Sequence, residues 1–397
     1  MIRVTMAAAA ILMVTMGARQ SLGLFVSPLN TATGLGITTI SFAYAIAQLT
    51  WGAIQPVGGA IADRYGPQRV LMAGVLVMAL GTALTPFMHS GLGLVLTLGI
   101  LAACGSGAGS FSVLIGAASK HLTPQQRGKS AGIINAGGSF GQFVFAPISQ
   151  ALIQALGWMG ALWSLAAISL GALPLVGVVA TKAQAHAAAH ATPSRPWNAV
   201  REAMSDRSYL LLHAGFFTCG FHIAFLVTHL PGEVNLCSLP PSVASTSLAL
   251  IGISNVVGSL LAGASTARFR SKHILALMYG SRAALVGLYL AAPKTSLTFY
   301  AFAVGLGLTW LATVPPTAAI VGKLFGVRYL ATLFGLTLLS HQIGGFFGAW
   351  LGGIALVRFG DYGWMWYADM SLALGAALIN LPIREAPPAR TPLAAPA

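Results

Sequence analysis

The sequence predicts an all-α membrane protein whose chain crosses the bilayer twelve times, with both ends in the cytoplasm. Composition is the first reason: 56% of the 397 residues are hydrophobic and 7% are charged, whereas about a quarter of the residues in soluble domains are charged. The second reason is that the apolar residues form long runs. The third is that Lys and Arg fall mainly in every second gap between these runs.

Twelve apolar runs are long enough to span the hydrocarbon core as helices, which takes about 20 residues each. Because backbone groups in lipid must be satisfied internally, we expect helices and no open strands. The first run follows Arg3 and resembles a cleaved leader, but eleven further runs favour an uncleaved first span. The runs lie at about residues 4–28, 38–61, 70–89, 92–118, 129–156, 158–181, 208–230, 242–266, 273–293, 296–321, 329–356 and 364–383.

The distribution of basic residues sets the expected orientation. With the N-terminus inside, 17 of the 21 Lys and Arg residues fall in cytoplasmic segments. Only Lys294 and Arg358 fall on the opposite side, and Arg19 and Arg282 lie within runs. Because basic loops are retained in the cytoplasm, the net charge of +14 indicates topology, not nucleic-acid binding. We expect a multi-pass protein of the cell inner membrane.

The longest polar interruption divides the chain into two sets of six runs. We expect an N-terminal bundle at 1–181, a cytoplasmic linker at 182–207, and a C-terminal bundle with a short cytoplasmic tail at 208–397. An internal repeat supports this division, since Gly59–Arg64 recurs as Gly263–Arg268. Two repeated halves predict a binding site at their interface, near the bilayer midplane.

Two stretches resemble a known family. Gly58–Arg69 (GGAIADRYGPQR) resembles the loop between the second and third helices of the major facilitator superfamily. The stretch from Arg127 through Pro147 to Trp158 resembles the fifth helix of its monocarboxylate and oxalate/formate porter branch. The resemblance implies two pseudo-symmetric six-helix bundles, eight cavity-lining helices and alternating access. In that branch the eighth helix usually carries a substrate-binding Arg, but Asn255–Gly263 here has no charge.

Asp63 and Arg64 lie at an expected helix end, beside Gly66 and Pro67, which turn the chain. An acid in this place can pair with a basic residue such as Arg127 or lie against a helix N-terminus. We interpret Asp63, Arg64 and Arg127 as a cytoplasmic gate that is closed in one state and open in the other. The alternative is a fixed structural turn.

Ten side chains within the runs are candidate substrate-binding residues. Polar residues at this depth are costly and usually face a cavity or another helix, and spacings of three or four residues place several of them on one helix face. For any small polar residue, hydrogen bonding between helices is the alternative. The ten are Arg19, Tyr44, Gln48, Asn135, His222, Asn255, Arg282, Trp310, His341 and Gln342.

Arg19 is the strongest of these candidates. A guanidinium stays protonated, and its planar fork fits a carboxylate through two parallel hydrogen bonds. No Asp or Glu lies in the eight runs expected to line the cavity. Because an unpaired charge in a low dielectric is costly, we expect the substrate to supply the negative charge. The alternative is an Arg that reaches the outer surface or is capped by backbone carbonyls.

Arg282 and Asp369 are the only other full charges well inside the runs. One interpretation is a structural bridge between the two, or bonds from each to polar neighbours. The other is that Arg282 turns into the cavity as the counterpart of Arg19. In the same half, the pair Pro315-Pro316 is expected to bend or break its helix.

The leading hypothesis is a secondary transporter of a small organic anion, of monocarboxylate type. No G-x-x-x-x-G-K-[ST] motif is present, so we expect ion gradients to supply the energy, by proton symport or anion exchange. His222 and His341 can change charge near neutral pH. Either one binds substrate or carries a coupled proton, unless it is a neutral histidine satisfied by its neighbours.

Two other function classes fit the sequence less well. An exporter of hydrophobic or cationic compounds should carry an acid on a cavity face, and none is found there. An intramembrane enzyme needs a nucleophile, paired acids or metal ligands at depth; Cys104, Cys219 and Cys237 show no paired spacing. We expect no cofactor and no metal. The expected partners are the organic anion, a coupled proton if transport is symport, and the lipid bilayer, with the protein a monomer.

Overall fold

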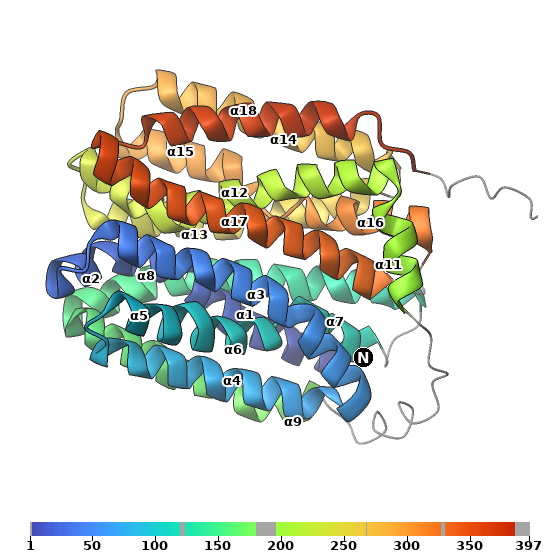
Figure 1. Cartoon of the computed structure of the whole chain (residues 1–397), viewed down its shortest axis with the longest axis horizontal. Coiled ribbons are helices and arrows are strands. Elements are labelled where there is room, and N and C mark those ends of the chain that lie inside the picture. Colours follow the sequence, from blue (N-terminus) through green and yellow to red (C-terminus); the bar gives the residue numbers. More distant parts are fainter. Residues whose placement is uncertain (1, 120–123, 180–195, 267, 327–329, 386–397) are drawn as a thin grey trace, which may run out of the picture.

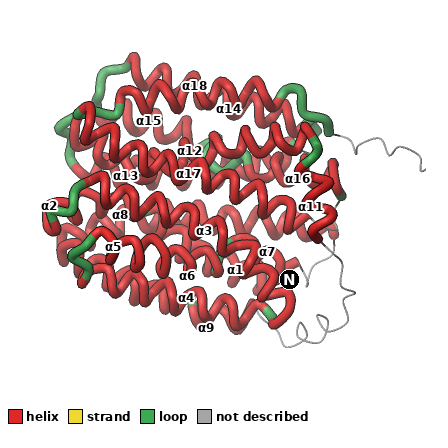
Figure 2. The backbone as a smooth tube through the Cα atoms, in the orientation of Figure 1, coloured by secondary structure: helices red, strands yellow, loops and turns green. Residues whose placement is uncertain are grey.

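The computed structural model describes residues 2–119, 124–179, 196–266, 268–326 and 330–385, and all regular elements in these ranges are helices (Figures 1 and 2). The predicted all-α fold is therefore confirmed for this part of the chain. The helices lie roughly along one common direction. The N-terminus and α11 are at one end of the molecule, and α2 and α5 are at the other (Figure 1).

The helices before residue 182 are α1 (Ile2–Gln20), η1 (Leu22–Phe25), α2 (Val26–Thr33), α3 (Ile37–Tyr65), α4 (Pro67–Leu84), η2 (Thr85–Phe87), α5 (Gly91–Leu94), the π-helical η3 (Val95–Ala102), α6 (Ala103–Ala108), α7 (Phe111–Ser119), α8 (Pro124–Leu170) and α9 (Leu173–Val179). Those after it are α11 (Pro196–Met204), α12 (Arg207–Leu236), α13 (Pro241–Ser265), α14 (Ser271–Ala291), α15 (Ser296–Gly307), α16 (Val314–Phe325), α17 (Leu330–Phe359) and α18 (Gly363–Asn380).

Nine stretches of the described chain are long and apolar enough to cross a membrane. Two shorter apolar helices, α15 and α16, follow one another, and α18 is outside the nine. The nine are Ile2–Thr33, Ile37–Gly59, Pro67–Phe87, Gly91–Ile115, Gly132–Val179, Arg207–Leu236, Pro241–Ser265, Ser271–Ala291 and Leu333–Phe359.

Two interruptions are notable, one within the stretch at residues 132–179 and one between the two shorter apolar helices. Gly157 divides α8, because its dihedral angles (φ 68°, ψ 173°) are outside the helical region and are accessible to glycine. This is the position where the sequence separates the fifth run from the sixth. The second interruption is the turn at residues 308–313 between α15 and α16, directly before Pro315-Pro316. The helix break predicted near these prolines is confirmed.

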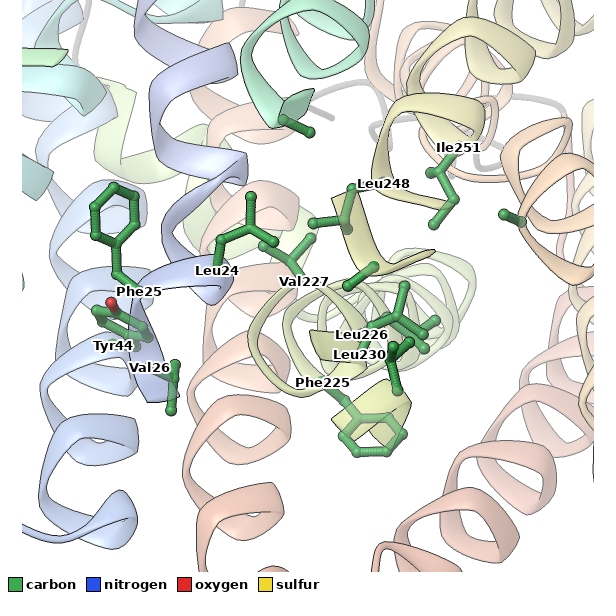
Figure 3. Packing of buried hydrophobic residues seen from close by; sticks show 14 of the residues in the cluster. Leu24, Phe25, Val26, Tyr44, Phe225, Leu226, Val227, Leu230, Leu248 and Ile251 are labelled. Atoms are coloured by element: carbon green, nitrogen blue, oxygen red, sulfur yellow. The ribbon is translucent and has the colours of Figure 1, made fainter. Parts of the chain in front are cut away.

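The helices before the linker and those after it contact each other along three seams. α3 packs along α17, α8 packs along α13, and η1 contacts α12. At the third seam the backbones meet closely, since a Cβ on Gly23 would overlap the carbonyl oxygen of Val227. Leu24 and Val227 belong to the same buried cluster there, and Figure 3 shows them next to each other. The interface between the two sets of helices is therefore closely packed at η1.

Glycine also allows α12 and α17 to approach closely. A Cβ on Gly344 or Gly348 would overlap the carbonyl oxygen of Phe217 or Phe221, and a Cβ on Gly220 would overlap the carbonyl oxygen of His341. Small residues at such contacts let membrane helices pack backbone to backbone. His341 lies at this seam, where its ring packs against Phe216 of α12.

Charged side chains join several helix ends outside the apolar core. Glu385 accepts hydrogen bonds from the backbone N–H of Lys272 and from the ammonium of Lys323, at 2.7 and 2.6 Å. Asp206 caps the first turn of α12 and accepts a hydrogen bond from Arg384 at 2.6 Å. The beginnings of α12 and α14, the end of α16 and the segment after α18 are thereby tied together.

Candidate functional site

Arg19 lies in the last turn of α1 and is partly buried. Its guanidinium donates a hydrogen bond to Oε1 of Gln48 on α3, and it lies over the ring of Trp51, 4.5 Å from the ring centroid. Both partners are uncharged. Within the described part of the chain, no carboxylate forms an ion pair with Arg19. Its positive charge is oriented by Gln48 and Trp51 but is not neutralised by them.

Gln48 meets a polar pair from the other half of the chain. Gln48 and Gln342 both lie 3.4 Å from the position that a Cβ on Gly345 would take, and Gln342 packs against Gly52 of α3. Gln342 is also hydrogen-bonded to Nδ1 of His341 at 3.0 Å. The structure therefore brings together Arg19, Gln48, His341 and Gln342 at the contact between α3 and α17.

This group contains polar atoms without partners. Oε1 of Gln342 and Nε2 of His341 are buried and have no hydrogen-bond partner among the described residues. Nε1 of Trp51 is also buried and has no partner among these residues. Leaving buried polar atoms unsatisfied costs free energy, so sites with several of them favour a polar ligand or ordered water. We define Arg19, Gln48, Trp51, His341 and Gln342 as the arginine site.

Asn135 and Asn255 belong to a different contact. Nδ2 of Asn255 donates to Oγ of Ser139 at 2.7 Å, and Nδ2 of Asn135 donates to Oγ of Ser259 at 3.3 Å. Oδ1 of Asn255 accepts from the N–H of Leu311 at 2.9 Å. The two asparagines thus hydrogen-bond α8 to α13, which is the alternative that the sequence left open for small polar residues.

Tyr44 and Trp310 are also engaged within the fold. The hydroxyl of Tyr44 donates to the carbonyl oxygen of Leu22 in η1, at 2.9 Å. Trp310 is fully buried, and its ring centroid lies 5.8 Å from that of His222. Among the described residues, neither side chain bonds to Arg19, so their role in substrate binding stays a prediction.

Arg282 is fully buried and saturated with acceptors. It donates to the carbonyl oxygens of Thr309 and Trp310, to Oγ1 of Thr309 at 3.4 Å, and to Sγ of Cys219 at 3.3 Å. Its guanidinium also lies 5.3 Å from the ring centroid of Tyr279. Two of these acceptors are carbonyls in the turn between α15 and α16.

Of the interpretations that the sequence left open for Arg282, the structure supports bonds to polar neighbours. Among the described residues, Arg282 forms no ion pair with Asp369, and its fully buried guanidinium faces the turn between α15 and α16 and not an open cavity. The physical reason is local: a helix break frees carbonyl groups that need donors, and the guanidinium of Arg282 supplies several at once.

Asp369 pairs with His222 instead. Nδ1 of His222 and Oδ2 of Asp369 are 2.5 Å apart, and the two side chains are 1% and 0% exposed. Sequence reasoning identified both residues but not their contact, because α12 and α18 are far apart in the chain. It missed Trp51 as well, although Trp51 follows Gln48 by three residues and so shares its helix face.

The three candidate gate residues lie outside the described side chains. Asp63 and Arg64 are within α3 and Arg127 is within α8, but the structure describes only their backbone.

Comparisons with known proteins agree on one family. The profile of the Major Facilitator Superfamily matches residues 8–281. Monocarboxylate transporter 13 of Rattus norvegicus is 28% identical over 340 residues, which cover 82% of this chain and 76% of that protein. The Oxalate:formate antiporter of Oxalobacter formigenes is 21% identical over 348 residues, covering 87% and 82%. The Probable sulfoacetate transporter SauU of Cupriavidus necator is 33% identical over 153 residues, covering 38% and 33%.

These relatives are named as transporters and not as enzymes. Together with the nine apolar stretches, the match shows a multi-pass membrane protein that functions in transport. The chain belongs to the major facilitator superfamily.

Proposed function

We propose that this protein is a secondary active transporter that carries a small organic anion of monocarboxylate type across the cell inner membrane by alternating access. The single observation that carries the proposal is the environment of Arg19. A permanent positive charge lies within an apolar helix bundle, and its side-chain contacts are a neutral amide and an aromatic ring. Such a charge favours an anionic ligand.

The arginine site has the donors that a carboxylate requires. The guanidinium fork can bind both carboxylate oxygens, and a bound anion would compete with Oε1 of Gln48 for the same N–H groups. On the other side of the α3–α17 contact, Gln342 and His341 of α17 offer neutral hydrogen-bonding groups. A ligand held by both α3 and α17 would contact both halves of the chain, which is the placement that alternating access needs.

The names of the relatives support this substrate class. Monocarboxylates, oxalate, formate and sulfoacetate are all small organic acids with a carboxylate group. An exporter of cationic compounds is less well supported. The buried acids of the C-terminal helices already have partners, since Asp369 is paired with His222 and Glu233 accepts from Tyr289.

We further propose twelve crossings in two six-helix bundles with a cytoplasmic linker between them. The count follows from the nine apolar stretches if residues 132–179 cross twice around Gly157, α15 and α16 cross together, and α18 crosses last. The basic helix ends joined by Glu385 and Asp206 would then face the cytoplasm, as basic segments generally do. Asp63, Arg64 and Arg127 remain our proposed gate at that side.

The test is uptake by the full-length protein in proteoliposomes, with radiolabelled formate, L-lactate, pyruvate and oxalate as probes. We expect accumulation of at least one probe. If Arg19 contributes two charge-assisted hydrogen bonds of about 1.5 kcal/mol each, Arg19→Ala lowers the uptake of the transported probe about 100-fold.

The control variant is Arg358→Ala, which removes an exposed arginine at the end of α17. We expect its uptake to stay within about twofold of wild type, since exposed substitutions are usually worth under 0.5 kcal/mol. Uptake by Arg19→Ala at the wild-type rate would contradict the proposed anion site. A wild type that carries none of the four acids would contradict the proposed substrate class.

A further inference from the structure

The pair formed by His222 and Asp369 is a second ionisable centre, separate from the arginine site. His222 is on α12 and Asp369 is on α18, and both side chains are almost completely buried. Nδ1 of His222 faces Oδ2 of Asp369 at 2.5 Å. The remaining polar atoms, Nε2 of His222 and Oδ1 of Asp369, have no hydrogen-bond partner among the described residues. The pair therefore has both a shared proton position and unoccupied polar atoms.

We propose that this pair binds the proton that is transported together with the anion. The inference rests on the proposed function above and adds the identity of the coupled ion and its site. A histidine next to a carboxylate takes up and releases a proton as one unit. Within the described part of the chain it is the one buried pair of a histidine with an acid.

The charged and titratable neighbours set the balance of charge around the pair. From α14, Arg282 reaches Cys219, which precedes His222 by almost one helical turn. Tyr279 lies beside Arg282 on the same helix. From α17, His341 packs against Phe216 of α12. Only Arg282 among these neighbours carries a permanent charge.

Two further groups lie on the helices around the pair. His229, on α12, hydrogen-bonds the carbonyl oxygen of Ala349. Glu233, also on α12, accepts a hydrogen bond from Tyr289 of α14 at 2.7 Å. Both therefore already have a partner, and among the described residues neither bonds to the His222–Asp369 pair.

Charge counting then links the proton to the anion. With Asp369 ionised and His222 neutral, the negative carboxylate balances the positive Arg282. One added proton leaves the three groups with a net charge of +1. Opposite charges attract over longer distances in a low dielectric. The added proton therefore strengthens the binding of an anion within the bundle. By reciprocity, the bound anion favours the proton.

The helix break lies next to the pair. The turn at residues 308–313 brings Trp310 to within 5.8 Å of His222, ring centroid to ring centroid. Arg282 holds the carbonyl groups of this turn. Irregular backbone at membrane depth commonly lines a cavity or moves with the transport cycle. Movement of this turn would expose the pair to one side of the membrane.

The proposed step involves no covalent change in the substrate. One proton binds the His222–Asp369 pair from water on the loading side while one carboxylate binds at Arg19. After the change of access, the proton leaves the same two side chains to water on the other side. For a monoanion the loaded cargo is electrically neutral, so a pH gradient drives net uptake.

The experiment separates net uptake from exchange in proteoliposomes loaded with a pH-sensitive dye, with the same four acids as probes. Wild type should accumulate its acid when the inside is alkaline and should carry protons inward with it. His222→Gln and Asp369→Asn keep similar shapes but cannot share the proton. We expect both to lose pH-driven accumulation and proton entry while counterflow exchange of the labelled acid continues, because exchange needs no net proton movement.

Two further variants distinguish a loss of coupling from misfolding. His229→Gln changes another buried histidine of α12, one that bonds a backbone carbonyl and not an acid, and it should keep pH-driven accumulation. The double variant His222→Asp with Asp369→His exchanges the two positions and should retain coupling where either single change loses it. A structural role alone would predict equal loss of uptake and exchange in the single variants, which would overturn the proposal.

A spectroscopic readout does not depend on the substrate. Infrared difference spectra of the wild-type protein at two pH values should contain a band of the His222–Asp369 pair that is missing in Asp369→Asn and in His222→Gln. A wild type with this band but no transport of the four acids would contradict the proposed function and leave the proton site supported. Robust exchange with no proton entry in wild type would overturn the proton site and leave the anion transporter supported.

Discussion

Arg19 and Arg282 are both arginines within apolar helices, but their surroundings differ in charge compensation and access. Arg282 is fully buried and donates to two carbonyls, a hydroxyl and a thiol. Arg19 is partly buried, and its side chain has one hydrogen-bond acceptor and one aromatic ring. The guanidinium of Arg282 stabilises a break in the backbone. The guanidinium of Arg19 has donor capacity left for a ligand.

The comparison shows that depth in the membrane does not by itself identify a binding arginine. Both positions satisfy the rule that an intramembrane charge is a functional candidate. What distinguishes them is whether the fold already fills the five N–H groups of the guanidinium.

Arg282→Ala has the largest expected effect on stability. It leaves the carbonyl groups of Thr309 and Trp310 without their donor, and each unsatisfied buried acceptor costs about 1–3 kcal/mol. We expect the free energy of unfolding in detergent, measured by titration with a denaturing detergent, to fall by about 4 kcal/mol. Arg19→Ala should change it by less, about 1–2 kcal/mol, since it removes one hydrogen bond and one ring contact. Equal losses in the two variants would remove the distinction.

Exchange of each arginine for lysine should separate them again. Arg19→Lys keeps the charge but offers no planar fork, so the second hydrogen bond to a carboxylate is lost. With about 1.5 kcal/mol for that bond, the KM for the transported acid should rise about tenfold with unchanged stability. Arg282→Lys should show the reverse: a destabilisation of about 1.5 kcal/mol with an unchanged KM. Uptake kinetics and unfolding of the same preparations decide between these outcomes.

The sequence predicts what depends on local pattern. The turn at Gly157 and the break before Pro315-Pro316 follow from glycine and proline chemistry, and both are observed. That no acid pairs with Arg19 among the described residues follows from composition, because so few Asp and Glu are present. These features need no knowledge of which helices are neighbours.

The contacts between helices could not be predicted in the same way. His222 and Asp369 are 147 residues apart. Helical periodicity does not indicate that α12 and α18 pack against each other. The same limit explains why the partners of Arg282 could not be named from the sequence, since the carbonyls that it binds belong to the turn between α15 and α16. The asparagines at the α8–α13 seam had two permitted roles in the sequence, and packing selected the contact between helices.

Trp51 should contribute less than either arginine. Its ring supports the Arg19 guanidinium from one face, and such contacts are worth about 1 kcal/mol when partly desolvated. Trp51→Leu should therefore raise the KM for the transported acid about fivefold, and Trp51→Phe about twofold. The control is Trp163→Leu, at an exposed position. A KM unchanged by Trp51→Leu would mean that Gln48 alone orients the guanidinium.

The smallest effect is expected where a cation already has a carboxylate partner. Burial acts to raise the pKa of Glu385, but the hydrogen bonds from the Lys272 N–H and the Lys323 ammonium outweigh it and lower the pKa below its ordinary value of 4.5. Its stabilising contribution is therefore complete above pH 4.5 and is lost as the pH falls through the lower folded-state pKa.

Glu385→Gln should lower the free energy of unfolding at pH 7 by no more than about 1 kcal/mol, because the pair with Lys323 is partly exposed. The difference between wild type and variant should shrink as the pH is lowered below 4.5. Unfolding titrations at a series of pH values measure this directly. A pH-independent difference would show that Glu385 acts through packing, and the contrast with the uncompensated charge of Arg19 would then rest on Arg282 alone.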